Sequence, residues 1–240
     1  MSTLPKSERL RKAICGSCLI AAPALLLVGG LLHPTETTDP ARQYEIISSS
    51  ADRWELAHWI ITASMLLMVG AVLGLAHLLH EQRPAEGILG GAVALVGVLA
   101  LFAVAAAETV VIPELGRSSE AGAAALYERI FEFGSTRWTV LLVAVLLLPV
   151  GLVAMSYGLY RAQVEPTWAA GALGLGALLF AAALPTGSAV VFAIGLAAMV
   201  VGWPRSAGRC SAKPTNSGST HPDRAQAARP DPGAHRSHAG

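Results

Sequence analysis

Several stretches of this sequence run for about 17–25 residues without a charged side chain, and no other feature constrains the fold as strongly. An α-helix rises 1.5 Å per residue, so a run of that length crosses a hydrocarbon core about 30 Å thick. Only 14% of the 240 residues are charged and 53% are hydrophobic, whereas soluble domains carry about 25% charge. The sequence therefore predicts an all-α membrane protein with several spans.

Six transmembrane spans are predicted. They cover about 14–32, 57–79, 88–111, 138–160, 167–184 and 187–203. The last two are divided at Leu184-Pro185-Thr186-Gly187, because proline and glycine favour a turn. The alternative for this region is one span with a re-entrant segment. The expected organisation is thus a six-helix bundle.

The two ends of the chain differ in composition from this transmembrane domain, which covers residues 14–203. Residues 1–13 form a basic N-terminus. Residues 204–240 are rich in Pro, Gly, Ser, Ala and Arg and have almost no large apolar side chain. Such a segment cannot bury enough apolar surface to offset its ordering entropy, so we expect a disordered tail.

Lysine and arginine are distributed asymmetrically about the six spans. With six spans both ends share one side, and that side holds twelve of the 17 basic residues. Basic residues favour the cytoplasmic side of a membrane. We therefore expect a multi-pass protein of the bacterial cytoplasmic membrane with both termini in the cytoplasm.

The two longer connections, about 33–56 and 112–137, then lie outside. The second contains SEAGAAALYERIFEFGSTRW, in which apolar and charged residues alternate at helical spacing. The first contains ARQYEIISSSADRW, which also has spaced apolar residues. Both are expected to contain short amphipathic helices that lie on the membrane surface or cover the bundle.

Three ionisable residues are predicted to share one depth near the outer boundary. His33 follows the first span and His58, in RWELAHWI, begins the second. Glu108 comes about 20 residues into the third span, which corresponds to roughly 30 Å. Ionisable groups within spans face the bundle interior and find partners, so we expect His58 against Glu108 with His33 close by.

This cluster has a structural and a chemical interpretation. His58 and Glu108 could be a hydrogen-bonded pair that joins two spans, while His33-Pro34 and Glu55 merely suit the ends of helices. Alternatively, His33, His58 and Glu108 form a site for a proton or for a divalent metal such as zinc, with Glu55, Glu36 or Asp39 nearby. Haem b is a weaker alternative, since it needs facing histidines at one depth.

The pattern of LLHP after the first span, Trp54-x-x-x-His58 at the second, and an Ala/Gly-rich bundle resembles small polytopic integral membrane proteins of high-GC bacteria. The resemblance covers about the first half of the chain and implies no activity.

Two function classes stay open. One is a structural or accessory protein in which the cluster is internal glue. The other is a metal- or proton-binding transporter, sensor or membrane metalloenzyme. No catalytic residue is predicted, and the expected partner is the lipid bilayer rather than nucleic acid. Small-residue faces such as Gly70-x-x-x-Gly74 and Gly87-x-x-x-Gly91 would also suit a homo-oligomer.

Overall fold

The computed structural model describes residues 6–37, 39–120, 122–131 and 135–202. All regular structure in these ranges is α-helical. The helices are α1 (Lys6–Leu32), α2 (Pro40–Ser49), α3 (Ala51–Leu79), α4 (Pro84–Arg117), α5 (Ala123–Ile130), α6 (Thr136–Ala162), α7 (Thr167–Thr186) and α8 (Ala189–Gly202). The predicted all-α fold is confirmed, and the predicted tail, 204–240, lies outside the described residues.

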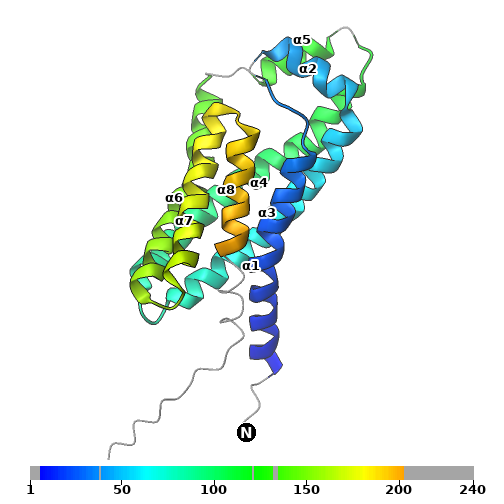
Figure 1. Ribbon diagram of the computed structural model, residues 1–240. Helices are drawn as coiled ribbons and strands as arrows, with labels where there is room; N and C mark the ends of the chain where they lie inside the picture. The colour runs from blue at the N-terminus through cyan, green and yellow to red at the C-terminus, as the bar shows by residue number, and fades with distance from the viewer. Residues whose placement is uncertain (1–5, 38, 121, 132–134, 203–240) are drawn as a thin grey trace, which may run out of the picture.

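The long helices form a closed ring in which each packs on its neighbours in the sequence. The order is α1, α3, α4, α6, α7 and α8, and α8 packs back against α1. The short helices α2 and α5 lie together at one end of this bundle (Figure 1). We call this the capped end; α1 starts, and α8 finishes, toward the opposite end (Figure 1).

Within the part of the chain that the structure describes, five helices, α1, α3, α4, α6 and α7, are long and apolar enough to cross a membrane. The sixth predicted span corresponds to α8, which has 14 residues and is therefore about 21 Å long. The chain reverses between α7 and α8 at Gly187, whose φ of 61° is in the left-handed region that suits glycine. The predicted break is thus present, although α7 continues through Pro185 to Thr186.

Several helices extend beyond the predicted apolar spans. The first candidate span, Ala13–Leu32, agrees with the predicted 14–32, but its helix α1 already begins at Lys6, and α3 begins at Ala51 although its span was expected from residue 57. α4 continues to Arg117 through Pro113, although the sequence suggested a loop from residue 112. Proline is tolerated inside membrane helices, and Pro113 is buried. The segments predicted as loops therefore contribute helical turns to the capped end.

Glycine allows the closest helix contacts in the bundle. A Cβ atom on Gly97 of α4 would overlap the backbone of Leu148 on α6. The predicted small-residue faces are also used within the chain, since Gly70 lies against Cys18 and Gly87 lies against Leu79. Close backbone approach is a main source of helix association in lipid, where apolar burial gives little driving force between helices.

An aromatic cluster holds the capped end together. Its buried members are Ile47, Trp54, Ile112, Tyr127 and Phe131. Tyr44 of α2 donates a hydrogen bond to the carbonyl of Leu115 near the end of α4, at 3.0 Å. α2 and α5 are therefore anchored on the ends of α3 and α4, directly beside the predicted ionisable cluster.

Candidate functional site

His58 is oriented by its own helix. One turn separates it from Trp54, and its Nδ1–H donates to the Trp54 carbonyl oxygen at 2.9 Å. The two rings stack with centroids 4.8 Å apart and an interplanar angle of 21°. Since a carbonyl only accepts hydrogen bonds, Nδ1 carries a proton and Nε2 faces the neighbouring helix. The ring is 97% buried, so this orientation is held by packing as well.

Glu108 of α4 contacts Nε2 of His58. Its Oε2 lies 3.0 Å from Nε2 of His58, and the Glu108 side chain is 23% exposed. The predicted contact between His58 and Glu108 is therefore confirmed. A neutral Nε2 and an ionised carboxylate would both be acceptors, so a bond of this length requires one shared proton between them.

That proton has two arrangements. In the first, an imidazolium donates to a carboxylate; in the second, a carboxylic acid donates to a neutral imidazole. Both arrangements keep the Nδ1–H bond to the Trp54 carbonyl. The pair as folded is thus a one-proton site, and removing its proton places two acceptors against each other.

His33 completes the cluster from the end of α1. Its backbone N–H donates to the Gly29 carbonyl at 2.9 Å, which is the last hydrogen bond of the helix. Arg53 donates from Nε to the Leu32 carbonyl at 2.7 Å. The side chain turns back into the bundle, with its ring centroid 4.8 Å from that of His58 and 4.5 Å from that of Trp54. His33 therefore both ends a helix and joins the cluster.

The ring of His33 is held in the same way as that of His58. Its Nδ1–H donates to the Pro34 carbonyl at 2.7 Å. Burial, followed by repulsion from His58, lowers the pKa of His33 from 6.5 to about 4. The ring is therefore neutral at neutral pH, and Nε2 has a lone pair available.

Of the three additional carboxylates that the sequence suggested, only Glu36 lies at the cluster. Its Oε1 is 3.7 Å from Nε2 of His33. Glu55 instead contacts Arg117 and Trp59, so its expected place beside the site was wrong. Asp39 accepts hydrogen bonds from two backbone N–H groups and caps α2. Glu55 and Asp39 therefore make hydrogen bonds outside the cluster.

A cavity of about 250 Å³ opens beside this cluster. Its polar lining includes His33, Glu36, His58 and Glu108. The turn between α7 and α8 and the ends of those helices also line it, largely with apolar side chains. Five of the ring helices therefore meet at a space that contains all three predicted residues.

Two threonines below the pair were not predicted. Thr109 donates to the Ala105 carbonyl at 2.6 Å, and Thr62 then donates to the Thr109 hydroxyl at 3.0 Å. This bond joins α3 to α4 one turn along from His58 and fixes their register. Hydroxyl groups are common on membrane helices, so nothing in the sequence distinguishes these two threonines from others.

The metal and haem predictions differ in how well the residues fit. Haem would need its histidines on opposite faces of a large ring, and direct contact between His33 and His58 leaves no space for one. For zinc, both Nε2 atoms are well oriented, because metal-binding histidines usually donate their other N–H to a carbonyl or carboxylate. However, among the described residues no group of three or more His, Cys, Asp or Glu is arranged to hold a metal ion.

Comparison with known proteins adds no assignment. No protein-family model, curated protein or solved structure matches this chain. The function of this chain is therefore inferred from the geometry of the cluster and its cavity.

Proposed function

We propose that this chain is a multi-pass membrane protein that binds and releases a proton at the His58–Glu108 pair, as part of a transporter or sensor. The observation that carries this proposal is the 3.0 Å distance between Nε2 and Oε2, combined with the fixed donor role of Nδ1. Together they require one shared proton, and the adjoining cavity gives that proton a route to water.

The site is proposed to face outward across the bacterial cytoplasmic membrane. With six spans, both ends of the chain lie on the same side of the membrane as twelve of the 17 basic residues. Because basic residues favour the cytoplasmic side, this supports placing both ends in the cytoplasm. The capped end lies away from the start of α1 and the finish of α8 (Figure 1). With this orientation the cavity is reached from the extracytoplasmic side, where pH varies most for a bacterial cell surface.

A purely structural role for the pair is the main competing account. A pair that only joined α3 to α4 would be expected within closely packed side chains, as Thr62 and Thr109 are. Instead, His58 and Glu108 line a cavity together with the neutral ring of His33. An ionisable pair with access to a cavity favours exchange with a ligand over a permanent link.

Infrared difference spectroscopy tests this proposal. A pH jump on the protein in lipid bilayers should give a carboxyl band that changes together with an imidazole band. Glu108→Gln should abolish the carboxyl band, and His58→Asn should shift it. Glu114→Gln is the matched control, because Glu114 is on the same helix with a side chain that is 74% exposed. A band that survives Glu108→Gln unchanged would rule out Glu108 as the proton site.

A divalent metal is the second candidate, favoured by the two Nε2 atoms that the Nδ1 bonds orient. Loss of the shared proton would leave His58 and Glu108 able to ligate, with His33 beside them. Equilibrium dialysis against zinc distinguishes the two candidates. Stoichiometric binding that needs His33, His58 and Glu108 supports a metal site; no binding at pH 7–8 (a range set by the neutral state of histidine) leaves the proton site alone.

A further inference from the structure

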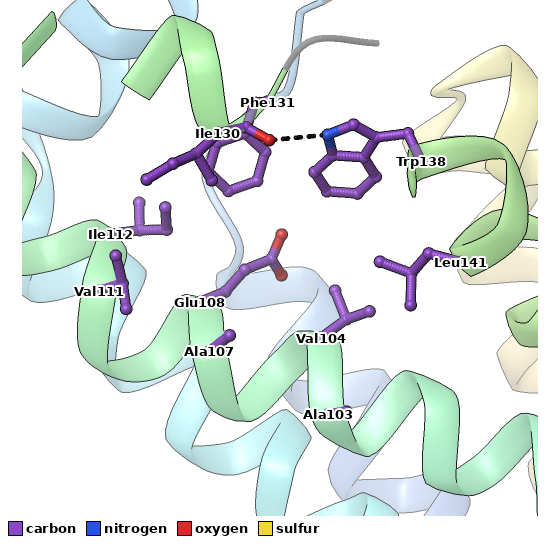
Figure 2. A pocket seen from close by; sticks show the side chains of 10 residues that line it. All are labelled: Ala103, Val104, Ala107, Glu108, Val111, Ile112, Ile130, Phe131, Trp138 and Leu141. Atoms are coloured by element: carbon purple, nitrogen blue, oxygen red, sulfur yellow. Dashed lines mark hydrogen bonds between the residues drawn. The ribbon is translucent and has the colours of Figure 1, made fainter. Parts of the chain in front are cut away.

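Glu108 also borders a second cavity on the other side of α4. This space is about 360 Å³ and lies between α4, the end of α5 and the start of α6. Apart from Glu108, every residue around it is apolar or aromatic. Figure 2 shows the Glu108 carboxylate projecting into this space below the rings of Phe131 and Trp138.

The two aromatic rings have fixed positions above the carboxylate. Trp138 donates from Nε1 to the Ile130 carbonyl at 2.9 Å, as the dashed line in Figure 2 marks. The Phe131 and Trp138 centroids are 5.2 Å apart with an interplanar angle of 33°. The faces of such rings carry negative electrostatic potential and attract cations. The cavity therefore combines a carboxylate with two aromatic rings inside an apolar enclosure.

The geometry points to a binding site for a lipophilic organic cation, meaning an amine or quaternary ammonium that carries an apolar body. When the His58–Glu108 pair has released its shared proton it carries one negative charge, which repels anions and which a neutral ligand would leave unbalanced in apolar surroundings. The hydrogen bond to His58 uses Oε2, and a carboxylate has further lone pairs on both oxygens. A cation can therefore approach Glu108 while His58 remains beside it.

Size and access agree with this class of ligand. An apolar cavity of about 150 Å³ is enough to hold benzene, so 360 Å³ accommodates an aromatic ring plus a trialkylammonium group. Val111 and Ile130 line the cavity and are 42% and 36% exposed. Both side chains are thus open to the surroundings of the bundle, which gives a ligand a route of entry.

This inference rests on the proposed function in one respect, namely that the His58–Glu108 pair releases and rebinds a proton.

The probe is isotopically labelled benzyltrimethylammonium, added to the full chain in lipid nanodiscs. Saturable binding is expected, with at least a tenfold loss of affinity in Glu108→Gln. Trp138→Leu should weaken binding about two- to thirtyfold, in line with one cation–π contact.

Three further measurements isolate the cation and the cavity. Neopentylbenzene has the same shape without the charge and should not compete. Leu141→Trp should block binding by filling the cavity while Glu108 stays in place. Glu114→Gln should bind normally.

Equal competition by neopentylbenzene, or unchanged binding in both Glu108→Gln and Leu141→Trp, would overturn the inference. If infrared spectra still assign the proton to Glu108 in that case, the proposed function stands and only the cation site fails. If the probe binds but Glu108 shows no proton exchange, the cation site stands without the coupling.

Discussion

His58 of α3 and Glu108 of α4 are joined across the bundle by a 3.0 Å contact between Nε2 and Oε2. They are fifty residues apart in the sequence. Glu108 borders two cavities, one lined by histidines and the other by aromatic and aliphatic side chains. Any change of charge at this pair therefore changes the electrostatic potential in both cavities.

Replacing His58 by alanine should lower the free energy of unfolding by about 1–3 kcal/mol, because the partly buried Glu108 would lose its hydrogen-bond partner. Thermal unfolding in detergent measures the loss. His77→Ala is the matched control, since His77 is exposed at the other end of α3, and it should change stability by less than about 0.5 kcal/mol. Equal effects for the two variants would contradict a specific role for the His58–Glu108 contact.

Acid should destabilise the fold through His33. Its pKa is about 4 in the folded protein and near 6.5 when unfolded. The unfolded chain thus binds the proton more tightly, so the contribution of His33 is complete above pH 6.5 and is lost as pH falls to 4. The loss amounts to at most about 3 kcal/mol.

Unfolding measured from pH 7.5 to 4 should therefore be less pH-dependent in His33→Gln than in the wild type. The charged groups that face His33 are His58, Glu36, Glu108 and Arg53. His80→Gln, at an exposed histidine that directly follows α3, should leave the wild-type profile unchanged. Parallel profiles for wild type and His33→Gln would show that His33 does not carry the effect.

The crossing of α4 and α6 gives a packing test that is independent of the site. Gly97→Ala should destabilise the bundle by about 1–3 kcal/mol, because the new methyl group overlaps the backbone of Leu148. Gly171→Ala meets nothing within 4 Å and should be neutral or stabilising by up to about 1 kcal/mol. Comparison of the two melting temperatures checks the contact, and a Gly97→Ala variant as stable as Gly171→Ala would argue against it.

The topology is tested by reporter fusions at two positions. A reporter joined after Gly202 should be active on the cytoplasmic side, and one inserted between Ser118 and Ser119 should be active outside. The reason is the excess of basic residues on the side that holds both ends. Because α8 has only 14 residues, an external signal after Gly202 would mean that six spans is the wrong number.

Much of the architecture follows from the sequence because long apolar runs permit little else than helices in a membrane. The contact between His58 and Glu108 was also predictable, since helical rise places both residues at one depth and a buried carboxylate needs a partner. The positions of Glu55 and Asp39 were not predictable. They depend on Arg117 and on the cap of α2, which the fold brings within reach.

The ends of the helices and the positions of the cavities were also not predictable from the sequence, for physical reasons. α4 continues through Pro113 because tertiary packing outweighs the usual tendency of proline to end a helix. The aromatic cavity beside Glu108 joins residues from α4, α5 and α6. The spacing of apolar residues within one segment does not determine the distances between three different helices, so this cavity could not be predicted.

The central claim is that His58 and Glu108 share one proton, and ¹⁵N NMR of histidine-labelled protein in bilayers, with ¹³C-labelled glutamate, measures it directly. Nδ1 of His58 should stay protonated throughout, because it is bound to the Trp54 carbonyl. Nε2 of His58 and the carboxyl carbon of Glu108 should change together in a single step as pH is varied. Two independent steps, or an unprotonated Nε2 facing an ionised Glu108 at the same pH, would contradict the account.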